Sequence, residues 1–237
     1  GNGELYVGQI KKIKGKYYGF RPERGDRGAA MLTGLTLLEV NGSDIIRVLD
    51  DDVDGDDLDL IIGDNQYYVE GVKTDIVRED PSNTISLFYF GNDEDSDGAM
   101  KTGNVTINVD GDSQTFKFST SGGAEGKGRG ITGIDDKKYV YKYGLRLKPS
   151  SDDKFLVVYA DGNTADSNAR VAKIDSQELR DIADDIGAVN RDGDSVSMLG
   201  VQNHTWLTGF KLLTTSGTIV KNKTAARDGA DWYFYVN

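Results

Sequence analysis

The chain has 237 residues and a formal net charge of −11, and it is long enough to bury a sizeable core in one or two domains. Because nucleic-acid affinity comes mainly from Lys and Arg neutralising phosphates, this acidic balance argues against DNA or RNA as a partner. The absence of cysteine excludes disulfides and iron–sulfur clusters. No apolar run approaches the roughly 20 residues that a membrane span needs.

The chain repeats one sequence phrase, which consists of an aromatic strand, a turn-rich gap and Thr-Gly. The strands and their Thr-Gly segments lie at 17–20 with 30–34, 88–90 with 99–103, 116–118 with 131–133, and Trp206 with 208–209. The first two copies also share the letters Ala-Met before x-Thr-Gly. A second phrase, an aromatic strand that runs into glycine, occurs at 67–73 and 141–147, and begins again at 233–237.

Five segments are predicted in chain order, with aromatic repeats at 1–40, 82–148 and 201–237, the last of them truncated. The segment 41–81 is predicted to be a β-hairpin insert, because 45–49 and 58–62 look like short strands on either side of an acidic turn. The segment 149–200 is predicted to be a β-rich insert. The expected fold class is therefore mainly β, with aromatic β-hairpin repeats, inserted β-rich segments and one short helix.

The predicted helix covers about 175–187. Asp175 and Glu178 have the spacing of a capping box, which satisfies backbone donors at a helix start. Apolar residues then recur at helical spacing, and Gly187 is typical of a helix end.

The stretch GNDEDSDG at 91–98 allows two interpretations. Asp93-x-Asp95-x-Asp97-Gly begins like an EF-hand calcium loop, but its twelfth position is Asn104 where that loop needs a bidentate Glu. The stretch also holds the same place between matching phrases as RPERGDRG does at 21–28, so a hairpin turn is the better interpretation. We expect at most weak calcium binding by Asp93, Asp95 and Asp97, and no other cofactor.

A similar run, Asp50-x-Asp52-x-Asp54-Gly55, has Ile61 at its twelfth position and is not expected to be an EF-hand either.

These phrases resemble the cell-wall-binding repeats of Gram-positive surface proteins, the choline-binding and glucan-binding family. The unit of that family is an aromatic hairpin, a turn and then GxMxTGW, and the similar segments here are 16–36, 87–148 and 206–237. Two features depart from the family pattern. Its usual Trp at the start of the strand is Leu87 or Thr115 here, and the Thr-Gly spacings of 69, 30 and 76 residues exceed a regular period of about twenty. The repeats are therefore degenerate and separated by inserts.

In that family, aromatic rings from successive hairpins hold the quaternary ammonium of choline by cation–π attraction. The resemblance therefore implies a set of candidate ligand-binding rings, against which stands the alternative that these rings simply pack across strands. The candidates are Tyr17, Tyr18, Phe20, Phe88, Tyr89, Phe90, Phe116, Phe118, Tyr139, Tyr141, Trp206, Trp232 and Tyr233. Trp is the best cation–π face, and the chain has only two, so a neutral polysaccharide is expected in preference to choline.

The resemblance implies a non-catalytic, extracellular binding module on the cell surface or in the cell wall, with a wall polymer or polysaccharide as partner. The acidic charge and the lack of a long apolar run leave no expected role for nucleic acid or membrane. One alternative is a structural stalk or adhesin segment that presents its inserts to a protein partner. A second alternative is a fragment of a cell-wall hydrolase.

Overall fold

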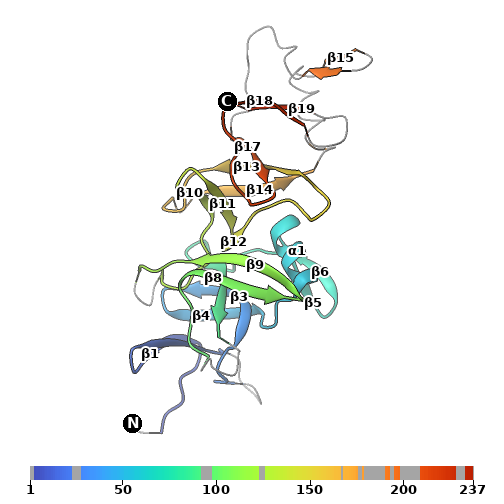
Figure 1. Cartoon of the computed structure of the whole chain (residues 1–237). Helices are drawn as coiled ribbons and strands as arrows, with labels where there is room; N and C mark the ends of the chain where they lie inside the picture. Colours follow the sequence, from blue (N-terminus) through green and yellow to red (C-terminus); the bar gives the residue numbers. More distant parts are fainter. Residues whose placement is uncertain are drawn as a thin grey trace. The chain divides into compact units, whose positions relative to one another are not determined.

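The computed structural model describes residues 3–22, 28–91, 98–122, 126–166, 168–175, 178, 190–192, 195–197, 209–227 and 233–236. The protein is mainly β, as the sequence predicts (Figure 1). Its contacts divide it into two compact units. The first unit contains Gly1–Ile131 with Tyr143–Leu145, and the second contains Thr132–Lys142 with Arg146–Asn237.

The first unit is built around an antiparallel sheet of strand order β2-β1-β4-β3-β7, with a β8–β9 hairpin and a separate β5–β6 hairpin. Its elements are β1 (Gln9–Ile13), β2 (Lys16–Phe20), β3 (Gly34–Asn41), β4 (Asp44–Asp50), α1 (Gly55–Gly63), β5 (Gln66–Val69), β6 (Val72–Asp75), β7 (Thr84–Phe90), β8 (Gly103–Val109) and β9 (Asp112–Phe118). Its buried core joins residues from four of these elements and from the Thr-Gly phrases, including Ile10, Leu38, Ile45, Phe90 and Met100.

The second unit contains the three-stranded sheet β14-β13-β17 and a set of hairpins. Its strands are β10 (Gly133–Asp135), β11 (Tyr139–Lys142), β13 (Phe155–Asp161), β14 (Arg170–Ile174), β15 (Asn190–Asp192), β16 (Ser195–Ser197), β17 (Phe210–Thr214), β18 (Lys223–Arg227) and β19 (Tyr233–Val236). The short strand β12 (Leu145–Arg146) pairs with β9 at Leu145 and Phe116. Strands β13 and β14 lie in the segment 149–200, which was predicted to be β-rich.

The repeated phrase corresponds to a repeated backbone geometry in the first unit. Each aromatic strand ends in a phenylalanine that forms a β-bridge with the residue three places before the Thr-Gly glycine. The bridged pairs are Phe20 with Met31, Phe90 with Met100, and Phe118 with Gly130. The same two backbone hydrogen bonds flank each bridge, with lengths of 2.8 to 3.1 Å. Three copies of the phrase are therefore one structural unit used three times.

Successive copies also stack on one another through the backbone. The N–H of Met100 donates to the carbonyl of Tyr17 at 2.8 Å, and the N–H of Gly130 donates to the carbonyl of Leu87 at 2.9 Å. In each case the acceptor lies three residues before the phenylalanine of the preceding copy. The repeats thus join in the same register twice, as stacked units of a repeat architecture do.

The prediction of a strand at 58–62 is wrong, because these residues form most of helix α1. Asp54 caps the helix, and Asp57 completes a capping box with it. The helix buries Leu58, Ile61 and Ile62, which have the helical spacing i, i+3 and i+4. The strand predicted at 45–49 is confirmed as β4, so the segment 41–81 contains a helix as well as strands.

The helix predicted at about 175–187 lies mostly outside the described residues. One hydrogen bond of its predicted capping box is present, since Asp175 Oδ1 accepts from the N–H of Glu178 at 2.8 Å. No helix within the described part of the chain has the length and apolar character needed to cross a bilayer.

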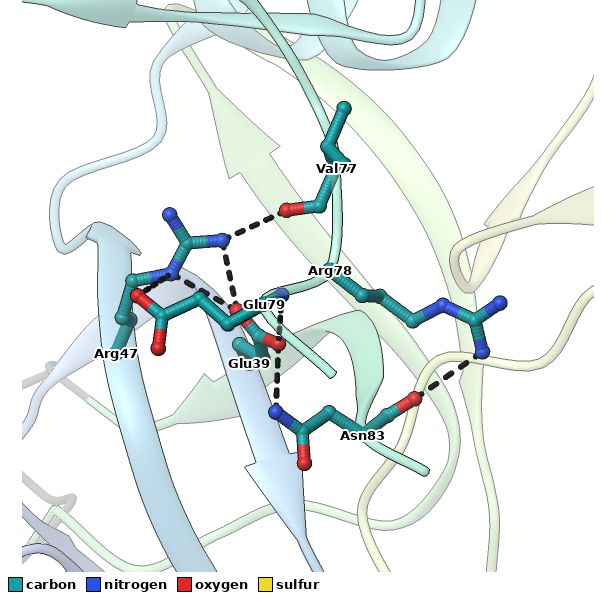
Figure 2. Close-up of polar contacts among 6 residues, drawn as sticks. All are labelled: Glu39, Arg47, Val77, Arg78, Glu79 and Asn83. Carbon is teal, nitrogen blue, oxygen red and sulfur yellow. Dashed lines mark hydrogen bonds and ion pairs between the residues drawn. The ribbon is translucent and has the colours of Figure 1, made fainter. Parts of the chain in front are cut away.

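The buried carboxylate of Glu39 connects residues 77–83, which precede β7, to the main sheet through hydrogen bonds (Figure 2). Glu39 on β3 has no exposed surface. Its oxygens accept from Asn83 Nδ2 at 2.7 Å, from the N–H of Glu79 at 2.7 Å and from Arg47 Nε at 2.8 Å. Arg47 also donates to the carbonyl of Val77 at 2.8 Å. Because both Glu39 oxygens have partners, its burial is compensated by charge-assisted hydrogen bonds.

Candidate functional site: the aromatic strands

Five of the candidate rings belong to the core. Phe88, Phe90, Phe116, Phe118 and Tyr141 are at most 3% exposed. Phe88 lies near Phe90 with ring centroids 6.4 Å apart, and Phe116 lies near Phe118 at 5.8 Å. These rings have no face open to a ligand in this structure, and the two rings of each close pair lie two residues apart on one strand, β7 or β9.

The other candidates are partly accessible or fall outside the described residues. Tyr17, Tyr18, Phe20, Tyr89 and Tyr139 are half-buried. Trp206 and Trp232 lie outside the described residues, and Tyr233 is described only as the first residue of strand β19.

The structure brings two of these rings together on the outer side of the β1–β2 hairpin. Gln9 pairs with Phe20 and Lys11 pairs with Tyr18, so all four side chains share one face of the ladder. The ring of Tyr6 adds to this face, with its centroid 5.4 Å from that of Phe20 and a tilt of 42°. We call these five residues the hairpin face.

Tyr6 was missed by the sequence analysis. It is 40% exposed and precedes β1, outside every repeated phrase, so no periodicity pointed to it. The only local signal is the apolar trio Leu5-Tyr6-Val7, whose members are all exposed.

Several accessible rings already have cations of the same chain above them. The Lys11 ammonium lies 5.6 Å from the Tyr6 centroid, and Lys12 and Lys127 lie 5.7 and 5.5 Å from the centroid of Tyr17. These distances are within the range of cation–π attraction.

The same arrangement occurs in the second unit. Lys138 and Arg146 each lie 4.9 Å from the centroid of Tyr139. A hydrogen bond with Lys138 lowers the pKa of the Tyr139 phenol, because the nearby ammonium favours the ionised form. The ring of Tyr139 is thus associated with positive charge from its own chain.

The candidate calcium residues Asp93, Asp95 and Asp97 lie outside the described residues. The second acidic run is described, and one of its carboxylates, that of Asp54, together with Asp110 from outside the run, accepts from backbone N–H groups at the start of helix α1. Asp54 accepts from the N–H of Asp57 at 2.9 Å, and Asp110 accepts from the N–H of Gly55 at 2.7 Å. Within the described ranges, no group of three or more acidic, His or Cys side chains has an arrangement suited to a metal ion.

Two carboxyl groups in and just after this run, those of Asp50 and Asp57, have raised pKa values. Burial, together with the charges of Asp50 and Asp54, raises the pKa of Asp57 to about 6, against a backbone hydrogen bond from Asp54 that lowers it. Burial likewise raises the pKa of Asp50. Burial and the nearby Asp charges both disfavour the ionised carboxylate, so the folded protein favours the protonated forms of Asp57 and Asp50.

Lowering the pH from 7 to 5 is therefore expected to make unfolding of the first unit less favourable. The folded pKa of Asp57, about 6, lies above its ordinary value of 3.8, so its stabilising contribution is fully present below about 3.8 and is lost as pH rises through about 6. Urea denaturation at both pH values measures the effect, and Asp57→Asn should remove most of it. A variant with the same pH dependence as the parent would assign the effect to other groups.

Comparison with known proteins gives little. No model of a known protein family matches the chain, and no curated protein matches it. A solved structure, CbpJ from Streptococcus pneumoniae TIGR4, is similar over 98% of this chain and 78% of its own, with 15% identity and a TM-score of 0.21. A TM-score of 0.21 is too low to show a shared fold or function.

Proposed function

We propose that the chain is a non-catalytic, extracellular module of a Gram-positive surface protein, and that it binds a neutral cell-wall polysaccharide through the hairpin face. The hairpin face is the observation that carries the proposal. It places the rings of Tyr6, Tyr18 and Phe20 beside the polar side chains of Gln9 and Lys11. Aromatic rings offer an apolar surface to the CH groups of a sugar, and a few polar groups among them fix its orientation.

The cations above the accessible rings favour a neutral ligand over choline. A quaternary ammonium gains its affinity by occupying the face of an aromatic ring. On Tyr6, Tyr17 and Tyr139 the chain already places its own Lys or Arg within 5.7 Å of the ring centroid. Choline would meet like charge at each of these rings, whereas a neutral sugar would not.

Retention on insoluble glucan tests the proposal against retention on a choline-mimicking resin. The protein should bind the glucan, and Tyr6→Ala and Tyr18→Ala should each weaken binding about fivefold, because one lost aromatic contact is worth about 1 kcal/mol. Tyr68→Ala is the matched control, since Tyr68 is 38% exposed and Tyr6 is 40% exposed, but Tyr68 lies on β5. Retention on the resin alone, with elution by free choline, would overturn the proposal.

A structural stalk is the second candidate function, and the burial of the repeat aromatics favours it. Four phenylalanines of the second and third aromatic strands are at most 1% exposed, so these strands serve to hold the repeats together. In this function the repeats space and orient the inserts, and no polysaccharide is retained. The same glucan experiment separates the two functions, because a stalk shows no retention that depends on Tyr6 or Tyr18.

A further inference from the structure

Strand β6 is an open edge of a sheet. Among the described strands it pairs only with β5. The N–H of Ile76 donates to the carbonyl of Asn65 at 2.9 Å, and hydrogen-bonded positions alternate along an antiparallel ladder. Val72, Thr74 and Ile76 therefore direct their backbone groups toward β5, while Lys73 and Asp75 direct theirs away from it. No backbone hydrogen bond within the described residues engages the outward groups of Lys73 and Asp75, so these groups can pair with another strand.

The surroundings of this edge are exposed and partly apolar. Val72 is 65% exposed, and Val69 opposite it is 42% exposed. The side chains of Lys73 and Asp75 are exposed as well. An exposed edge of this kind is a template for the addition of a strand from another chain.

The charges of β6 select a second copy of the same strand in one register. Two β6 strands that pair antiparallel about a two-fold axis must match outward residues with outward residues. An axis at Lys73 puts Lys opposite Lys, and an axis at Asp75 puts Asp opposite Asp, which is destabilising. An axis at Thr74 puts Lys73 opposite the partner's Asp75 on both sides. The strand is thus complementary to itself in this register.

We propose that β6 pairs with β6 of a second copy, with Thr74 on the two-fold axis. Each Lys73 then exchanges two backbone hydrogen bonds with the partner's Asp75, and their side chains form an ion pair on one face. On the other face the exposed Val72 lies opposite the partner's Ile76. The two hairpins become one sheet of order β5-β6-β6-β5. This self-association does not depend on the proposed polysaccharide binding.

Cysteine cross-linking tests the register, because the native chain has no cysteine. In Thr74→Cys the two thiols face each other across the axis, at the Cβ separation of about 4.5–5.5 Å of directly opposite residues, close to that of a disulfide. In Val72→Cys, the matched control on the same face, they are four residues out of register, about 14 Å apart. Mild oxidation should give at least about tenfold more covalent dimer for Thr74→Cys. Equal yields would overturn the proposed register.

Sedimentation equilibrium tests whether the charges of Lys73 and Asp75 control dimerisation. Lys73→Asp and Asp75→Lys should each weaken dimerisation at least about tenfold, as like charges then face one another across the axis. The two variants mixed in equal amounts should form a heterodimer, and the double variant Lys73→Asp/Asp75→Lys should dimerise within about threefold of the parent. The proposal would be overturned if the parent protein stayed monomeric at all concentrations and Thr74→Cys gave no cross-link. The partner of the β6 edge would then be a different protein.

Discussion

The Gly130→Ala variant is expected to lose at least about 4 kcal/mol of unfolding free energy, the range of the most damaging single substitutions. A Cβ atom at position 130 would lie 2.1 Å from the carbonyl oxygen of Tyr143, 2.4 Å from its carbonyl carbon and 2.7 Å from the amide nitrogen of Gly144. All three are backbone atoms, so no side-chain rotation relieves the overlap. The third repeat can form its bridge to Phe118 only after the backbone at 143–144 has moved.

Urea denaturation of the purified variants measures this loss. Gly63→Ala is the control, because nothing lies within 4 Å of a Cβ at that position and Gly63 ends helix α1, where alanine should be neutral or stabilising by up to about 1 kcal/mol. If Gly130→Ala cost less than about 1 kcal/mol, the close approach of residues 143–144 to the third repeat would be disproved.

Position 130 shows how much of the structure the repeated phrase could predict. Ala-Met-x-Thr-Gly in two copies predicted matching structure, and the bridges of Phe20 and Phe90 to Met31 and Met100 confirm it. In the third copy glycine replaces the methionine, and the bridge to Phe118 is kept. The phrase therefore specified the backbone of the repeat. It did not reveal that the third copy has no room for a side chain at position 130, because the residues that crowd Gly130 lie thirteen and fourteen places further along the chain.

Stacking also explains why the second and third copies have glycine two residues before the bridged position. A Cβ on Gly98 would lie 2.6 Å from Met31 Cε, and one on Gly128 would lie 2.3 Å from Met100 Sδ. Each glycine therefore leaves room for the methionine of the preceding copy. The equivalent residue of the first copy is Ala29, which keeps the same left-handed backbone at φ 62° where a side chain is normally disfavoured.

Burial of the aromatic strands could be predicted only in part. Alternation along β7 shows that Phe88 and Phe90 share one side and Tyr89 the other, but not which side is covered. The cover of Phe90 includes Gly19, where a Cβ would lie 2.7 Å from Phe90 Cζ. That contact joins residues 71 places apart in sequence. Helix α1 was missed because its apolar residues fit the alternation of a strand, at 58, 60 and 62, as well as helical spacing, at 58, 61 and 62. Only the pair Asp54 and Asp57 marked its start.

Replacing the buried carboxylate should have the second large effect. Glu39→Ala is expected to cost about 3 kcal/mol, because it leaves the amide of Asn83, the N–H of Glu79 and the guanidinium of Arg47 without their shared acceptor. Glu39→Gln should cost about 2 kcal/mol, since its amide group points a donor at a site made of donors. Urea denaturation at pH 7 gives both values.

Lowering the pH tests the contribution of the Glu39 charge separately from that of the side-chain shape. Burial raises its pKa, but the hydrogen bonds from Asn83, Glu79 and Arg47, with the charge of Arg47, lower it by more, so that the folded pKa lies below the ordinary value of 4.5. The contribution of Glu39 to stability is therefore present above this ordinary, unfolded pKa of 4.5 and is lost as pH falls through the folded pKa. The difference between the parent and Glu39→Gln should shrink across this window.

Glu79→Gln supplies the matched control for this prediction. The carboxylate of Glu79 also contacts Arg47 Nε, at 3.2 Å, but it is 54% exposed, and exposed ion pairs contribute at most about 1 kcal/mol. Its substitution should cost less than about 0.5 kcal/mol at pH 7, because the backbone N–H that Glu39 uses remains. Equal losses for Glu39→Gln and Glu79→Gln would show that Arg47, and not the buried carboxylate, holds residues 77–83 against the sheet.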